Sequence, residues 1–224
     1  MLTVIKGLLE ATAAKELVDA LSGAPFVDGA ATAQGATKTV KHSLQLPVEH
    51  ALSQKLGRVI LARLNTSDAF KAAAVPHTIL PLRFCRYDVD MAYGTHLDLP
   101  IMGTPSGSIR TDLSMTVFLT DPNDYDGGVL VFESEYGTKS VRGAAGDAVI
   151  YPSSLLHRVE PVTRGSRMVA ISWMQSMVRD PAARKILFDI VQVASKLEQT
   201  AANSPESLLL RQAHYNLLRM WADQ

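Results

Sequence analysis

The sequence predicts a mainly β protein, an antiparallel double sheet of the jelly-roll type with helices at both ends of the chain. Two observations favour this fold. Between residues 75 and 177, apolar side chains recur with period two in short segments separated by turn clusters such as PNDYDGG and GAAG, and no helical pattern lies between them. Before and after this region, the apolar spacing becomes three and four residues, which is typical of helices with one buried face.

Composition limits the classes of partner. A chain of 224 residues is long enough for one sizeable core, and Lys plus Arg equal Asp plus Glu at 22 each. A net charge of zero argues against nucleic acid or an anionic membrane as a partner. No apolar run approaches the ~20 residues of a membrane span. We therefore expect partners to be small molecules or a second copy of the chain.

The compartment is inferred from two further features. The first 21 residues carry acidic side chains through their apolar part, so they do not read as a signal peptide. The single cysteine, Cys85, excludes an internal disulfide and suits a reducing compartment. The sequence therefore predicts a cytoplasmic protein.

Residues 1–75 are expected to form a helical support region. A short strand over 2–6 precedes a helix over 10–21, residues 26–46 read as extended or irregular, Pro47 opens a second helix, and Ser67 caps a short third one over 68–74. Each helix has one apolar stripe, so a sheet that follows them is the natural surface on which to bury it.

Residues 76–178 are expected to form the jelly-roll core. The segments that read as strands are 78–90, 109–120, 129–134, 138–142, 147–151, 157–162 and 167–177. In the last of these, Arg167, Val169, Ile171 and Trp173 share one face. If Arg167 points into the barrel, Trp173 lines the barrel too.

Residues 179–224 are expected to form a C-terminal helical region. Asp180 with Pro181 begins one helix, and Ser204 with Pro205 begins another that carries apolar residues up to Trp221. An aromatic so near the chain end frays unless something covers it. We expect these helices to pack on the N-terminal helices and to extend into a two-fold homodimer contact, with Trp221 folding back on its own barrel as the alternative.

The candidate metal centre lies in the stretch YDVDMAYGTHLD and in a second stretch far downstream. His96 and Asp98 are one residue apart, so in an extended strand their side chains leave the same face. His157 can join them if the intervening strands fold back. Two imidazoles and one carboxylate on one face of an octahedral ion form the facial triad of non-haem Fe(II) oxygenases, which leaves other positions open for chemistry.

Arg167 follows ten residues after His157, where the next strand would bring it back alongside. A buried guanidinium there is suited to binding a carboxylate through two parallel hydrogen bonds. This joint pattern resembles the Fe(II)- and 2-oxoglutarate-dependent dioxygenases, whose signature is His-x-Asp, a long gap, His, and a basic residue about ten positions later.

The resemblance extends over nearly the whole chain to the PKHD-type hydroxylases. The stretches that carry it include VDGAATAQGATKTVKHSLQLP, the middle segment from RTDLSMTVFLT to SWMQSMVRD, and the ending HYNLLRMWAD. It implies a double-stranded β-helix (jelly-roll, cupin-like) core with N- and C-terminal helices. It also implies Fe(II) bound by His96, Asp98 and His157, and 2-oxoglutarate bound by Arg167.

The resemblance further implies a reaction that consumes O₂, converts 2-oxoglutarate to succinate and CO₂, and hydroxylates a small-molecule or peptide substrate, with L-ascorbate keeping the iron reduced. Halogenating relatives lack the metal carboxylate, so Asp98 favours hydroxylation or desaturation. Asp90 stands where related sequences usually have Gly, and Leu99 stands where they often have Asn. We expect both to lie beside the open face of the iron and to affect substrate choice.

Other polar residues have weaker claims. Tyr87 either hydrogen-bonds a 2-oxoglutarate carboxylate or packs in the core with its hydroxyl satisfied, and the sequence leaves both open. Thr111, Ser114 and Arg158 could support the site, although structural roles are favoured. The remaining histidines have no partner pattern and are expected to be structural or at the surface.

Two other functions remain open from the residues alone. A metal-dependent hydrolase or isomerase on a cupin-like barrel could use the same three ligands with Zn²⁺, but Arg167 would then have no role. A non-catalytic jelly-roll binding module would need neither His96 nor Asp98.

Overall fold

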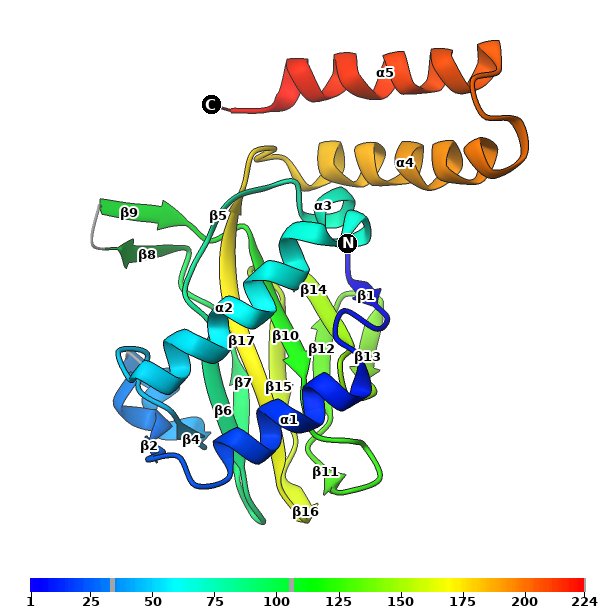
Figure 1. The fold of residues 1–224 in the computed structure, drawn as a ribbon. Helices are drawn as coiled ribbons and strands as arrows, with labels where there is room; N and C mark the ends of the chain where they lie inside the picture. The colour runs from blue at the N-terminus through cyan, green and yellow to red at the C-terminus, as the bar shows by residue number, and fades with distance from the viewer. Residues whose placement is uncertain (33–34, 105–106, 224) are drawn as a thin grey trace.

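The computed structural model describes residues 1–32, 35–104 and 107–223. Its centre is a pair of antiparallel sheets, with helices on the outer face of the larger sheet (Figure 1). The larger sheet has the order β1 (Thr3–Ile5), β14 (Ala148–Pro152), β10 (Leu113–Phe118), β17 (Arg167–Ser176), β6 (Arg83–Tyr87), β4 (Leu44–Gln45) and β2 (Val27–Asp28), and β5 (Pro76–Ile79) also pairs with β17.

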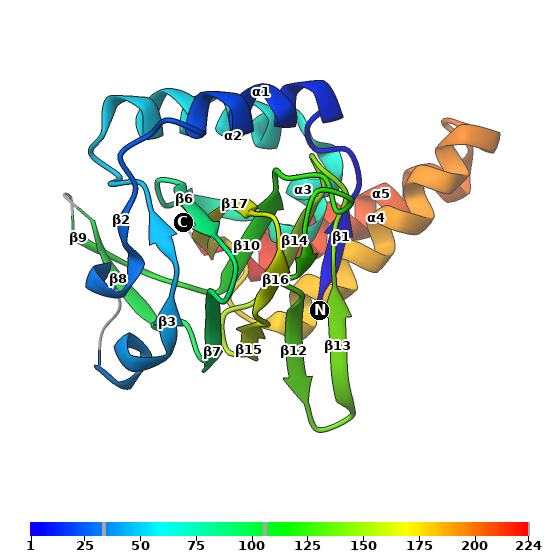
Figure 2. The ribbon, with the colours of Figure 1, turned by 90° about the horizontal axis from the view of Figure 1, so that it is seen from below.

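The smaller sheet lies on the side of the larger one away from the helices (Figure 2). Its order is β13 (Gly137–Val141), β12 (Leu130–Ser134), β15 (Leu156–Val159), β7 (Ala92–His96) and β3 (Lys41–His42). Two small ribbons complete the β structure, β11 (Asp126–Gly127) with β16 (Val162–Arg164) and β8 (Ile101–Thr104) with β9 (Gly107–Arg110). The predicted double-sheet core with flanking helices is confirmed.

The N-terminal region supplies both helices and strands. Its helices are α1 (Ala11–Leu21), α2 (Ala51–Thr66) and α3 (Asp68–Ala74), and two 3₁₀ segments, η1 (Gly29–Thr32) and η2 (Gly35–Val40), precede β3. Ser67 caps α3 as expected, because its hydroxyl accepts a hydrogen bond from the Phe70 amide. Helix α2 begins at Ala51, four residues after Pro47, because the His50 ring accepts the Leu52 amide and serves as the cap.

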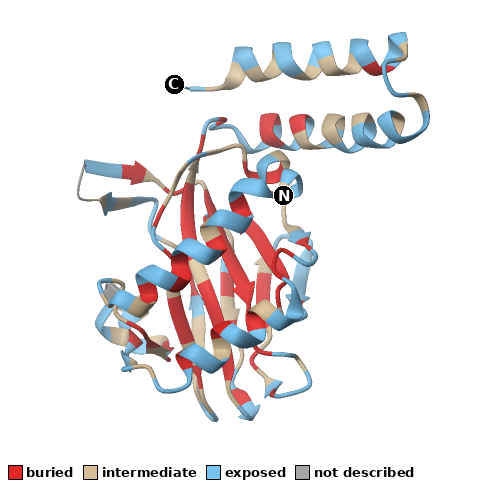
Figure 3. Cartoon of the chain, in the orientation of Figure 1, coloured by how far each residue is buried: buried red, intermediate tan, exposed pale blue. Residues whose placement is uncertain are grey.

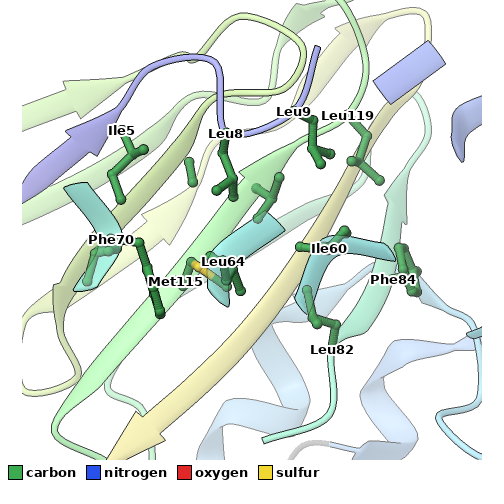
Figure 4. Close-up of a cluster of buried hydrophobic side chains, with 14 of the residues drawn as sticks. Ile5, Leu8, Leu9, Ile60, Leu64, Phe70, Leu82, Phe84, Met115 and Leu119 are labelled. Carbon is green, nitrogen blue, oxygen red and sulfur yellow. The ribbon is translucent and has the colours of Figure 1, made fainter. Parts of the chain in front are cut away.

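The main core lies between the larger sheet and helices α1, α2 and α3. Ile60 and Leu64 of α2 and Phe70 of α3 meet Met115 of β10 and Phe84 of β6, as Figure 4 shows. Buried residues follow the sheet-facing side of each helix, while the outer sides are exposed (Figure 3). The apolar stripes read from the sequence are therefore buried on the sheet, as predicted.

Strand boundaries differ from the prediction in several places. The strand expected over 78–90 is two strands, β5 and β6, because Pro81 lies between them and cannot donate to a ladder. The strand expected over 109–120 is divided by Thr111 and Asp112, whose amides donate outside the β9–β10 line, to Pro100 and Met174. Strands β7 and β8 were not predicted, since AYGTH and IMGT show no clear alternation.

The C-terminal helices α4 (Pro181–Ala201) and α5 (Pro205–Trp221) form a hairpin that projects from the sheets (Figure 1). Its base packs on Val178 and Val75, with Leu187, Leu217 and Trp221 contributing from the helices. The chain end is tied to the residue that follows β17, because the Asp223 amide donates to the Met177 carbonyl at 2.8 Å. Trp221 is thus partly buried against its own chain.

The outer part of the hairpin is mostly exposed (Figure 3). Its exposed apolar side chains include Val193, Leu208 and Leu209. Across the described residues, no helix has both the length and the apolar character that crossing a membrane requires.

Candidate functional site

A cavity of about 690 Å³ opens between the two sheets, and β17 forms one of its walls. Arg167, Val169, Ile171 and Trp173 line it. The alternate residues Met168, Ala170 and Met174 lie in the core under the helices. The predicted division of β17 into a barrel face and a core face therefore holds for these residues, and Trp173 lines the barrel with Arg167, but Ser172, which was expected on the core face, also lines the cavity.

Three candidate metal ligands meet at this cavity. His96, the last residue of β7, lies directly opposite His157 of β15 in the strand register, and their ring centroids are 4.2 Å apart. Asp98 follows two residues after β7 ends, and its Oδ2 lies 3.7 Å from Nε2 of His157. The ligand atoms of the three residues all lie within 4.8 Å of one another. Asp98 reaches the site from the loop after β7, whereas His96 lies in the strand itself.

Hydrogen bonds to backbone carbonyls orient both imidazoles. Nδ1 of His96 donates to the Gly94 carbonyl at 2.8 Å, and Nδ1 of His157 donates to the Leu155 carbonyl at 2.9 Å. In the neutral form of each ring these bonds place the proton on Nδ1 and leave Nε2 as the nitrogen that can bind a metal. Burial, together with the neighbouring His157, lowers the pKa of His96 below its usual range, so this imidazole is neutral near pH 7.

A pair of serines holds the carboxylate. Ser114 of β10 donates to Oδ2 of Asp98 at 2.5 Å, and the hydroxyls of Ser114 and Ser153 lie 2.8 Å apart. Ser153 can donate to Ser114 and so leave the Ser114 proton for Asp98. Such a contact fixes a ligand that no strand ladder restrains.

The other two weak candidates lie elsewhere. Thr111 donates its hydroxyl to the Leu99 carbonyl and positions the loop after Asp98. Arg158 forms ion pairs with Glu133 and Glu160 and does not line the cavity. Both roles are structural. His42, His50, His77 and His214 also lie outside the cavity lining.

Arg167 is a buried cation in the cavity with unused hydrogen-bond donors. Its side chain is 1% exposed, and its Nε and Nη1 atoms are buried without a hydrogen-bond partner in the described residues. The guanidinium lies 5.2 Å from the ring centre of Tyr87 and 5.7 Å from that of Phe118. A buried cation that keeps unused donors fits a carboxylate ligand, because such donors are costly when they stay unsatisfied.

Three tyrosines surround these groups. Tyr87 of β6 is the register partner of Arg167 and lines the cavity, and burial raises its pKa above the usual range, so its hydroxyl stays protonated. Tyr93 stacks on His96 with ring centroids 3.6 Å apart. Tyr151 places its hydroxyl 3.5 Å from Nε2 of His157.

Sequence reasoning missed three residues of the site, namely Lys41, Tyr151 and Ser153. Tyr151 ends a strand that the alternation identified, so its side of the sheet could have been followed to the cavity. Ser153 lies in a turn and had no signal. Lys41 lies in β3, in a stretch that alternates weakly, and its buried position depends on pairing with β7.

The two sequence departures have different surroundings. Leu99 lines the cavity, whereas Asp90 does not, so the expectation that both lie beside the metal face is wrong for Asp90. Asp90 has φ +67° in the turn between β6 and β7. Asp tolerates this left-handed conformation better than most residues, which explains how it occupies a position that suits Gly.

Gly128 controls the space around Arg167. A Cβ atom there would lie 2.8 Å from Cδ of Arg167, so the turn must approach the arginine without a side chain. The sequence assigned this glycine to a turn, and its φ of +59° agrees. The close approach to Arg167 was not predicted.

We predict that Gly128→Ala destabilises the protein by ~1–3 kcal/mol more than Gly7→Ala, because it adds overpacking against Arg167 to the backbone strain. Gly7 is the matched control, since its φ is +60° and a Cβ there meets nothing within 4 Å. Chemical denaturation measures both variants. Equal losses of stability in the two variants would show that Arg167 moves away from the added methyl group without a loss of free energy.

Comparison with known proteins places this site in a family. A sequence model of the 2OG-Fe(II) oxygenase superfamily matches residues 82–175, and a model of the PKHD-type hydroxylase C-terminal domain matches residues 182–223. A PKHD-type hydroxylase of Hyphomonas neptunium is 44% identical, with 100% of both chains covered. One of Acidovorax ebreus is 43% identical, with 99% of both chains covered.

Solved structures agree at the level of fold. A prolyl-4-hydroxylase of Pseudomonas putida has a TM-score of 0.53 at 17% identity, covering 78% of this chain and 92% of its own. HygX of Streptomyces hygroscopicus, solved with nickel and 2-oxoglutarate bound, has a TM-score of 0.54 at 16% identity, covering 78% and 82%. By its full-length relatives and its matched domains, the chain belongs to the PKHD-type hydroxylases of the 2OG-Fe(II) oxygenase superfamily.

Proposed function

We propose that the protein hydroxylates a small-molecule or peptide substrate with Fe(II) and 2-oxoglutarate, and that His96, Asp98 and His157 hold the iron while Arg167 holds the co-substrate. The observation that supports this most is the arrangement of one cavity. A three-ligand cluster and a buried arginine with unused donors both line it. The metal supplies Lewis acidity and redox chemistry, and the protein supplies orientation and protection from water.

The side chains fit these roles. The neutral His96 needs no deprotonation before it binds a cation, and its Nε2 is kept free by the bond from Nδ1 to Gly94. Ser114 holds Asp98 so that the carboxylate does not rotate away from the two rings. Three protein ligands on one face of an octahedral ion leave its other positions open for a molecule from solution.

Arg167 and Tyr87 form the proposed carboxylate site. The guanidinium offers Nε and Nη1 to the far carboxylate of 2-oxoglutarate, and the protonated Tyr87 hydroxyl can donate to the same group. Their opposing positions in the β6–β17 ladder hold the two side chains together. Binding by both would restrain the co-substrate on the β17 wall of the cavity.

The finer steps follow from this assignment. We propose that 2-oxoglutarate is converted to succinate and CO₂ as O₂ is consumed, and that L-ascorbate restores iron that has been oxidised. HygX was solved with nickel and 2-oxoglutarate, which supports a co-substrate of this kind on the same fold. A hydrolase that used the same ligands would leave the unsatisfied donors of Arg167 without a function.

Cytoplasmic location and dimerisation are also proposed. Cys85 is buried as a free thiol, which suits a reducing compartment. Exposed apolar residues on the outer hairpin, among them Leu209 at 66% exposure, support a two-fold contact through α4 and α5. Because Trp221 already packs against Val178 and Leu187 of its own chain, we assign this contact to the outer hairpin.

The triad assignment predicts one Fe(II) per chain. His157→Ala should lose nearly all bound iron and all turnover, because two ligands hold a hydrated divalent ion weakly. Iron content after anaerobic purification, followed by a succinate assay, measures this. The exposed His77→Ala is the control and should keep both. Full iron occupancy in His157→Ala would refute the assignment.

The carboxylate assignment predicts a separate phenotype. Arg167→Ala should raise the 2-oxoglutarate requirement by roughly tenfold to several thousandfold, since loss of a buried charged pair costs ~2–5 kcal/mol. Its iron content should stay near that of the wild type. Arg164→Ala removes an exposed arginine of the neighbouring ribbon and should change neither quantity. An unaltered 2-oxoglutarate dependence in Arg167→Ala would place the co-substrate elsewhere.

The dimer proposal predicts that light scattering at micromolar concentration gives twice the mass of one chain. Leu209→Glu should shift the protein to monomer, because it places a charge in the apolar contact and leaves the base of the hairpin intact. A monomeric wild type is the result that rejects the dimer.

A further inference from the structure

Lys41 is a buried cation that the roles assigned so far do not use. It is 6% exposed, lies in β3 and lines the same cavity as the metal-ligand cluster. Its ammonium lies 3.0 Å from Oγ1 of Thr32 and 3.4 Å from Oε1 of Gln45. Both partners are neutral, and within the described parts of the chain no ion pair includes Lys41.

The burial of Lys41 favours an anionic ligand on energetic grounds. Taking an ammonium out of water is costly unless an opposite charge and hydrogen bonds replace the solvent. Burial is the first cause of a lowered pKa at Lys41, which reflects this cost. The two neutral oxygens account for two of its three N–H donors, so the group can accept a further partner.

The charges around the cavity also favour an anionic ligand. Its lining contains three cationic side chains, Lys41, Arg83 and Arg167, and two carboxylates, Asp98 and the exposed Glu49. Arg83 lies over the Trp173 ring at 5.1 Å and also forms no ion pair in the described residues. Fe(II) and 2-oxoglutarate carry opposite double charges, so loading the site leaves this positive excess in place.

The position of Lys41 separates it from the co-substrate site. Lys41 is the register partner of Tyr93, and its ammonium lies 5.5 Å from the centre of that ring. Tyr93 in turn stacks on His96. Arg167 instead stands on β17 of the other sheet, beside Tyr87. The cavity thus has cationic side chains on both sheets, with Arg83 and Arg167 on the larger sheet and Lys41 on the smaller one.

We propose that Lys41 binds a carboxylate of the substrate, so that the substrate is an organic acid such as an amino acid or a peptide with a free C-terminus. This inference rests on the proposed function, because it assigns Arg167 to 2-oxoglutarate. Lys41 acts in it as a specificity residue, and Thr32 and Gln45 hold its ammonium in place.

The test uses matched pairs of probes that differ in charge alone. N-acetylglycine, N-acetylproline, N-acetylleucine and N-acetylglutamate, each with the corresponding C-terminal amide, are titrated by calorimetry into protein loaded anaerobically with Fe(II) and 2-oxoglutarate. The wild type should bind at least one acid about tenfold to 150-fold more tightly than its amide, as expected for a hydrogen bond to a charged group. Lys41→Met should remove this preference, and Lys41→Arg should retain most of it.

Lys38→Met is the matched control, because it removes the same charge from an exposed position three residues earlier. It should keep the preference for acids. Thermal melts of all variants establish that they are folded. A wild type that binds no acid, or binds acids and amides equally, overturns the proposal, and so does a preference that survives in folded Lys41→Met.

The 2-oxoglutarate affinity of Lys41→Met distinguishes this proposal from the proposed function. It should equal that of the wild type. If 2-oxoglutarate binding falls instead while the acid preference stays, Lys41 belongs to the co-substrate site and the inference fails, while the oxygenase assignment stands. If the wild type binds neither Fe(II) nor 2-oxoglutarate, the proposed function fails. In that case the acids and amides are compared in metal-free Arg167→Ala, in which Arg167 cannot bind the acids. This comparison still tests whether Lys41 binds a carboxylate.

Discussion

The structure depends on the pairing of β17 at the middle of the larger sheet. This strand bonds to β10 on one side and to β6 on the other, and both of its faces are needed. Met168, Ala170 and Met174 pack under the helices, while Arg167 and Trp173 face the cavity. A slip of one residue would exchange the two faces and place a guanidinium in the apolar core. The core that fixes the register therefore also aims Arg167.

The same ladders position the groups around Arg167. Tyr87 stands opposite Arg167 across β6, and Ser114 stands opposite Trp173 across β10. In the smaller sheet, the register of β15 and β7 places His157 opposite His96. The rings of Phe132 and Tyr151 pack edge to face, with their centroids 4.7 Å apart. They lie beside His157 and support this wall of the cavity. The site is thus formed by strand registers, with Asp98 as the one metal-ligand candidate on a loop.

The charged side chains in this cavity reduce the stability of the folded protein. Lys41 and Arg167 are both buried cations, and Arg167 retains unsatisfied donors. Such groups lower stability unless ligands satisfy them, and functional sites commonly show this conflict. The apolar core between the larger sheet and the helices offsets the cost on the opposite face of the sheet (Figure 4). The C-terminal hairpin contributes little to the cavity or to the apolar core, since it contacts the rest of the chain at its base.

The sequence by itself determined the elements whose signal is local. Period-two alternation gave the faces of β17, Ser67, Asp180 and Ser204 marked helix starts, and the spacing of His96, Asp98, His157 and Arg167 indicated the chemistry. Tertiary structure alone decided the rest. Strand β7 lacks alternation and exists because β15 and β3 pair with it, and Lys41 reaches the cavity through that pairing. Gly128 looked like an ordinary turn residue until Arg167 was placed against it. These last contacts join residues far apart in the chain and leave no local pattern, so the sequence could not reveal them.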